Sequence, residues 1–183
     1  MTAICADNII LVGFPGTGKT LVGKQVAEEL GWVLVDMDME LEVQAGKSIP
    51  RIFSEDGEAA FRVMEKELLR EICLGNERVI STGGGVVLDQ ENRDLMLTKG
   101  FVICLDALPE TIHQRLRGES GTLEPERPLL SGPDSLERIQ RGKAGREGHY
   151  AVAHHTIATD SLTVEQVASQ VVAAWTKMAA CKS

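Results

Sequence analysis

The sequence predicts an α/β protein with three layers, in which helices cover both faces of a five-stranded parallel sheet. Short runs rich in Val, Ile and Leu alternate along the chain with longer segments of helical apolar spacing. Strands that alternate with helices in this way form parallel sheets. Most of the runs are nearly continuous in apolar residues, which is typical of strands covered on both faces. The expected strands are 8–13, 32–35, 78–81, 101–105 and 155–158.

The first half of the chain has clear helix signals between these strands. Segment 17–30 carries an apolar stripe that includes Leu21, and Gly31 is suited to end that helix. After the second strand, helical spacing is loose over 39–53 and stronger over 57–73. We therefore expect three helices before the third strand.

The second half continues the alternation with one interruption. Helices are expected over 92–99 and 108–117, a charged helix over 135–147 and an amphipathic closing helix over 164–178. Between them, segment 118–133 holds three Gly and three Pro in sixteen residues and has no periodicity. Such composition is typical of a loop, and this segment is the candidate mobile lid.

Length and charge limit the classes of function. A chain of 183 residues fits a single domain, taken here as 1–183, and can bury a core without disulfides. The formal net charge of −8 argues against nucleic-acid and anionic-membrane partners. The chain has no apolar run of membrane-spanning length and no signal peptide, and its four Cys are scattered. We expect a cytoplasmic monomer.

One motif dominates the sequence. Residues 13–20, Gly-Phe-Pro-Gly-Thr-Gly-Lys-Thr, match the P-loop pattern G-x-x-x-x-G-K-[ST]. The alternative is a glycine-rich turn without a ligand, but a strand before the motif and a helix after it favour phosphate binding. In this interpretation the lysine reaches the β- and γ-phosphates of ATP and the last hydroxyl ligates Mg²⁺. The residues expected to bind nucleotide here are Gly16, Thr17, Gly18, Lys19 and Thr20.

Two further segments follow strands at the same edge of the predicted sheet. Asp36 and Asp38 would face the same way in an extended segment and could serve a metal-bound water and a substrate hydroxyl. Helix capping by Asp38 is an equally good explanation. The Thr82–Gly85 run allows a ligand to approach the backbone closely, although a flexible connection is the simpler explanation.

One arginine stands apart from the others. Arg127 lies inside the Gly- and Pro-rich segment 118–133. An arginine on a mobile loop beside a P-loop suggests a lid that closes over the γ-phosphate.

Taken together, these motifs resemble the shikimate kinase family, which has a nucleoside monophosphate kinase-like P-loop fold. The resemblance runs nearly end to end, because the order and spacing of many elements match. The matching stretches are 13–20, Val35–Asp38, Ser48–Phe53, Asp56–Glu65, Ser81–Gly85, Arg127–Leu130 and Tyr150. The family transfers the γ-phosphate of MgATP to the 3-hydroxyl of shikimate, within aromatic amino-acid biosynthesis.

The resemblance also implies residue roles. Lys19, Asp38 and Arg127 would be catalytic, with Asp38 accepting the proton of the reacting hydroxyl. Thr20 and Asp36 would serve Mg²⁺. The shikimate-binding region would span about 36–65, and the residues implied to contact or orient the substrate are Asp38, Phe53, Arg62, Glu65, Gly83, Gly84, Gly85 and Arg146.

Two points distinguish this chain within that resemblance. The family's Arg-x-Pro-Leu-Tyr is Arg146-Glu-Gly-His-Tyr150 here, which keeps the Arg and the Tyr. Arg117 matches the residue that stacks on adenine, with Arg115 as a competing register.

A gluconate-type kinase and a non-catalytic nucleotide-binding module remain alternative functions. A substrate without a carboxylate would not need Arg62 and Arg146.

Overall fold

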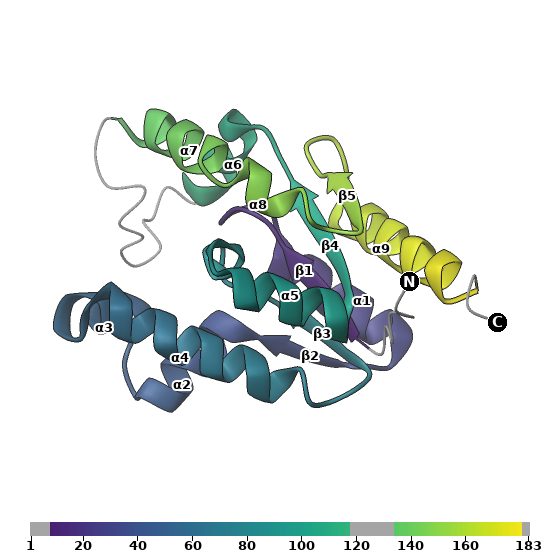
Figure 1. Ribbon diagram of the computed structural model, residues 1–183. Coiled ribbons are helices and arrows are strands. Elements are labelled where there is room, and N and C mark those ends of the chain that lie inside the picture. Colours follow the sequence, from purple (N-terminus) through teal and green to yellow (C-terminus); the bar gives the residue numbers. More distant parts are fainter. Residues whose placement is uncertain (1–7, 118–133, 181–183) are drawn as a thin grey trace.

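Figure 1 shows the computed structural model, which describes residues 8–117 and 134–180. Five strands form one parallel sheet in the order β2-β3-β1-β4-β5. This confirms the predicted α/β class. The strands are β1 (Asn8–Val12), β2 (Val33–Asp36), β3 (Arg78–Ser81), β4 (Phe101–Asp106) and β5 (His155–Ala158).

Helices cover both faces of the sheet, so the molecule has three layers (Figure 1). On one face, α1 (Lys19–Leu30) packs against α9 (Val164–Ala180). The remaining helices pack on the other face. They are α2 (Met37–Ala45), α3 (Ile49–Glu55), α4 (Gly57–Ile72), the 3₁₀ turn η1 (Val86–Leu88), α5 (Gln90–Lys99), α6 (Pro109–Arg117), α7 (Ser135–Ala144) and α8 (Glu147–Tyr150).

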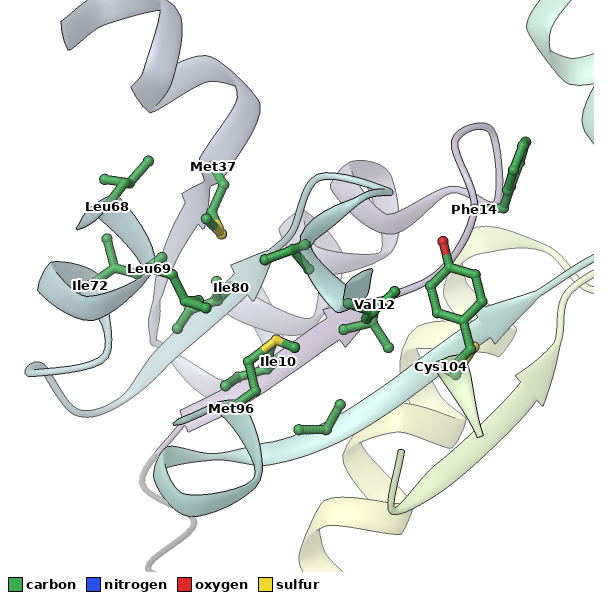
Figure 2. Close-up of a cluster of buried hydrophobic side chains, with 14 of the residues drawn as sticks. Ile10, Val12, Phe14, Met37, Leu68, Leu69, Ile72, Ile80, Met96 and Cys104 are labelled. Carbon is green, nitrogen blue, oxygen red and sulfur yellow. The ribbon is translucent and has the colours of Figure 1, made fainter. Parts of the chain in front are cut away.

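The central strand β1 explains why its sequence is apolar throughout. Ile9 and Leu11 belong to the core cluster under α1 and α9, whereas Ile10 and Val12 belong to the cluster on the opposite face. All four side chains have 0% of their surface exposed. Figure 2 shows the second cluster, where Ile10 and Val12 lie among side chains from β3, α4 and α5. Burying four such side chains stabilises the fold by roughly 1.5–3 kcal/mol each.

Three expectations about helices need correction. The loose helix over 39–53 is two helices, because Gly46 adopts the left-handed conformation (φ 65°) and closes α2. The charged helix ends at Ala144 rather than at residue 147, and a separate short helix follows. Leu21 was assigned to the buried stripe of α1 but is 63% exposed, since the buried face of that helix is centred on Val22 and Val26.

The sheet brings three loops together at one edge. Ser81, the last residue of β3, is paired with Asp36 of β2 and with Leu11 of β1. The segments that follow these three strands therefore start side by side, as carboxyl ends of neighbouring parallel strands do. No helix in the described part of the chain is long and apolar enough to span a bilayer.

Candidate active site

The loop between β1 and α1 is built to receive an anion. Gly16 and Gly18 have φ of 87° and 95°, a backbone that L side chains rarely adopt. The loop ends at the N-terminus of α1, where free backbone N–H groups favour negative charge. Lys19 folds back over the loop and donates from Nζ to the carbonyls of Gly13 (2.9 Å) and Phe14 (3.3 Å). Its charge is thus held at the loop itself, where a phosphate would bind.

Thr20 and Asp36 meet beside this loop. The Thr20 hydroxyl donates to Asp36 Oδ2 at 2.6 Å and lies 3.4 Å from the Ser81 hydroxyl. This places a hydroxyl and a carboxylate, both hard oxygen donors, next to the phosphate loop, which is the chemistry that Mg²⁺ prefers. Among residues 8–117 and 134–180, no three His, Cys, Asp or Glu side chains gather at a potential metal site.

The two aspartates after β2 have separate structural roles. Asp36 caps α2, because its Oδ1 accepts from the N–H groups of Asp38 (3.1 Å) and Met39 (3.2 Å). The capping interpretation of Asp38 is therefore wrong. The expectation that the two carboxylates share a face of an extended segment is also wrong, since the helix begins at Met37 and Asp38 lies in its first turn.

Asp38 and Glu65 converge on Gly83. A Cβ placed on Gly83 would lie 2.9 Å from Asp38 Oδ1 and 2.9 Å from Glu65 Oε1. Asp38 is exposed, whereas Glu65 has only 2% of its surface exposed. Three elements distant in sequence, α2, α4 and the turn after β3, thus bring two carboxylates to one point. Glycine at position 83 leaves the space that both oxygens occupy.

Arg62 is the cation of this cluster. Its Nη1 donates to Glu65 at 2.8 Å and its Nη2 to Glu58 at 3.1 Å. The guanidinium lies against Gly85, since a Cβ there would come within 2.5 Å of Nη1. Burial raises the pKa of Glu65 above its ordinary value; the charge of Arg62 opposes this rise, and the charge of Asp38 adds to it. The buried carboxylate and the half-buried guanidinium hold each other in place.

Gly84 connects the P-loop with the other candidate arginine. The Gly84 carbonyl accepts from the Tyr150 hydroxyl at 2.7 Å and from Arg146 Nη1 at 3.3 Å. Pro15 of the P-loop packs directly on Gly84, where a Cβ would meet its ring at 2.5 Å. The guanidinium of Arg146 lies over the Phe14 ring, 5.2 Å from its centre. Sequence reasoning gave Tyr150 no role, because no local pattern reveals a contact made across 66 residues.

The remaining candidates lie around this centre. Phe53 is 36% exposed and packs on Phe61, with ring centres 4.7 Å apart. Arg115 donates to the hydroxyl (2.9 Å) and the carbonyl (2.7 Å) of Thr159, so its guanidinium joins α6 to the end of β5. Arg117, at the end of α6, is exposed. Arg127 and the expected lid over 118–133 lie outside the residues that the structure describes.

Comparisons with known proteins agree with this geometry. A family model for Shikimate kinase matches residues 15–176. The shikimate kinase of Symbiobacterium thermophilum is 45% identical over 165 residues, which cover 90% of this chain and 93% of the relative. The solved structure of the shikimate kinase of Acinetobacter baumannii in complex with shikimate superposes with a TM-score of 0.86 at 32% identity and covers 95% of both chains. A gluconokinase of Sinorhizobium meliloti has a TM-score of 0.56 at 13% identity over 93% of this chain and 92% of its own, which reflects the fold alone.

Proposed function

The chain belongs to the shikimate kinase family. We propose specific roles for its site residues in the transfer of the γ-phosphate of ATP to the 3-hydroxyl of shikimate. The enzyme is an ATP-dependent phosphotransferase with an alcohol group as acceptor. The observation that carries the assignment of roles is the convergence of Asp38, Glu65 and Arg62 on the turn Gly83–Gly85, next to the P-loop.

The nucleotide phosphates bind at the P-loop. The left-handed glycines 16 and 18 turn backbone N–H groups inward, and Thr17 lies between them, just before α1 begins at Lys19. When a phosphate arrives, Lys19 exchanges its two carbonyl partners for β- and γ-phosphate oxygens. Because Lys19 is 8% exposed and its ammonium is already at the loop, little movement is required. Lys19 then stabilises the charge that develops on the transferred group.

Thr20 and Asp36 are the residues that would hold Mg²⁺, Thr20 through its hydroxyl and Asp36 through water. When bound, the ion neutralises phosphate charge. Asp36 accepts a hydrogen bond from the Thr20 hydroxyl at 2.6 Å, so the lone pairs of that oxygen remain available to a metal ion. The two remaining bonds of Asp36, to the start of α2, keep its carboxylate from rotating away.

Asp38 accepts the proton of the reacting hydroxyl. Asp38 is exposed, and its carboxylate lies at Gly83, one residue before Gly84, on which the P-loop residue Pro15 packs. Neighbouring Glu65 is buried and paired with Arg62, so it stays behind Asp38 as a positioning group. Proton acceptance by a carboxylate held in place is general base catalysis.

The substrate carboxylate is held by Arg62, Arg146 and the backbone of Gly84. Both guanidiniums are anchored on one side, Arg62 by Glu65 and Arg146 by the Phe14 ring. Their remaining N–H donors suit a carboxylate, which arginine binds in a two-pronged geometry. Phe53, which is 36% exposed, supplies a ring on which the substrate ring can pack.

Arg127 closes over the phosphates from the lid, and Arg117 stacks on adenine. Arg117 is the better candidate than Arg115, because Arg115 is committed to Thr159. The monomer expected from the sequence stays a prediction. We place the enzyme in the cytoplasm, where its substrate ATP is available.

Measuring ADP release with MgATP and a panel of hydroxy acids tests the proposal. Turnover is expected with shikimate and not with gluconate, because gluconate lacks the cyclic frame that presents a hydroxyl to Asp38 while its carboxylate reaches Arg62. Turnover with gluconate alone would overturn the substrate and leave the kinase chemistry standing. ADP release without dependence on any acceptor would overturn the transfer reaction.

A further inference from the structure

The carbonyl of Gly84 has two donors from outside its own loop. The Tyr150 hydroxyl donates at 2.7 Å and Arg146 Nη1 at 3.3 Å. A carbonyl oxygen has two lone pairs and can accept both bonds. The two donors differ in strength, since the tyrosine bond is short and the arginine bond lies near the limit for hydrogen bonding.

The two donors also differ in freedom. Tyr150 is 8% exposed and belongs to the core cluster on this face of the sheet, so its ring is fixed by packing. Burial raises its pKa well above the ordinary value, so the hydroxyl keeps its proton and remains a donor. Arg146 is half-buried on the surface of Phe14 and is assigned above to the substrate carboxylate.

These contacts bear on the orientation of one peptide group. The peptide between Gly84 and Gly85 is planar and trans, as no cis bond occurs in the described residues. Fixing the Gly84 carbonyl therefore fixes the direction of the Gly85 N–H on the opposite side. Gly85 lies directly against the Arg62 guanidinium. A rotation of this peptide would disturb both halves of the carboxylate clamp.

We propose that Tyr150 is a positioning residue for the acceptor substrate, which acts by holding the Gly84 carbonyl while Arg146 turns to the substrate carboxylate. The proposal rests on the clamp assigned above. When the carboxylate draws the guanidinium away from Gly84, the carbonyl keeps the Tyr150 hydroxyl. Without that hydroxyl, Arg146 would have to leave a partly buried acceptor unsatisfied, which weakens substrate binding.

The direct test is Tyr150→Phe, which removes the hydroxyl and keeps the ring in the core. We expect KM and Kd for shikimate to rise about tenfold, the equilibrium equivalent of one lost hydrogen bond. KM for ATP should change by less than twofold, and kcat at saturating shikimate should stay within threefold. Equal increases for both substrates, or no increase for shikimate, would overturn the proposal.

A matched control comes from the opposite end of the sheet. Asn8 is 1% exposed and donates from Nδ2 to the carbonyl of Gly75 at 2.8 Å, another buried side chain that holds a glycine carbonyl. Asn8→Ala should lower the thermal midpoint without a selective rise in KM for shikimate. A selective rise in this control as well would mean that the effect of Tyr150→Phe reports general destabilisation.

A second measurement needs no stable variant. Tyr150 is the chain's single tyrosine, so 3-fluorotyrosine gives one ¹⁹F resonance. Addition of shikimate should shift this resonance, and addition of a non-hydrolysable ATP analogue should shift it much less. An unmoved resonance at saturating shikimate would overturn the proposal.

The variant Arg62→Lys distinguishes a failure of the carboxylate clamp from a failure of the role of Tyr150. If Arg62→Lys leaves shikimate binding unchanged, the clamp itself is wrong. If Arg62→Lys weakens shikimate binding while Tyr150→Phe does not, only the role of Tyr150 fails.

Discussion

Replacing Gly83 by alanine tests the geometry on which the catalytic assignment depends. A Cβ at this position would lie 2.9 Å from Asp38 Oδ1 and from Glu65 Oε1, whereas ordinary contacts begin near 3.4 Å. Gly83 does not have a positive φ, so alanine is compatible with the backbone. Each carboxylate must therefore withdraw by about 0.5 Å, and Glu65 is tied to Arg62. Most of the displacement should fall on Asp38.

The expected loss is catalytic rather than structural. Since a misplacement of about 1 Å costs up to roughly 100-fold in rate, half that displacement should lower kcat about tenfold. Crowding of two flexible side-chain ends should cost about 1 kcal/mol of stability. That corresponds to a decrease of roughly 2–4 °C in the thermal midpoint for a chain of this size. The affinity for ATP should not change, because Gly83 is not part of the P-loop.

Steady-state ADP release gives kcat, and titration with nucleotide in a calorimeter gives the affinity for ATP. Gly148→Ala is the matched control, because an added Cβ at Gly148 would meet nothing within 4 Å apart from its chain neighbours and the backbone of its own helix. It should retain wild-type kcat and gain slightly in stability, as expected for Gly→Ala in a helix. If Gly83→Ala turned over shikimate within twofold of the wild type, Asp38 would not need its position at Gly83 and the assignment of the general base would fail.

Three further predictions concern separate parts of the molecule. Arg62→Lys keeps a cation beside buried Glu65 but loses the forked donor of the guanidinium. Calorimetry should show that shikimate affinity falls roughly tenfold or more while ATP affinity stays constant. Equal losses of affinity for both ligands would make Arg62 purely structural. Burial acts to raise the pKa of Asp89, but hydrogen bonds from Lys66 and from backbone N–H groups at the start of α5 lower it below its ordinary value overall. The part of its stabilising effect that depends on charge is therefore present above about pH 4 and lost as the pH falls through the lowered pKa. Asp89→Ala should cost about 1 kcal/mol in denaturant unfolding at pH 7 and less at a pH below that pKa. A cost that does not depend on pH would contradict this reasoning. Arg127→Ala should lower kcat about 10³-fold with shikimate affinity unchanged, and a folded variant with kcat within about threefold of the wild type would refute the lid role.

Sequence patterns were sufficient to predict the features that depend only on residues close together in the chain. The apolar run from Asn8 could only be a strand covered on both faces, and β1 is buried on both. The P-loop was predictable because its glycines, lysine and threonine are consecutive and act through one turn of backbone. The approximate positions of β1 to β4 followed in the same way, since each has a short apolar run bounded by turn or helix signals.

Local patterns failed where two structures compete for the same residues. Asp36 and Asp38 both have the chemistry of a helix cap, and the sequence analysis considered only Asp38 for that role. Pairing of Val33–Asp36 with β3 extends β2 to Asp36, so the helix begins at Met37 and Asp36 becomes its cap. Tertiary pairing, rather than intrinsic preference, decided which carboxylate caps α2 and which one lies at Gly83.

The sequence by itself therefore determined the alternation of strands and helices, the phosphate-binding loop and the set of polar residues available for chemistry, because these depend on neighbours within a few positions. Only the tertiary structure decided that Asp38, Glu65 and Gly83 meet at one point, and that the Gly84 carbonyl accepts from Tyr150. These contacts join segments that are far apart in the chain. They form because the parallel order of the sheet brings the carboxyl ends of β2, β3 and β1 together, and no pattern within a single segment encodes that distance.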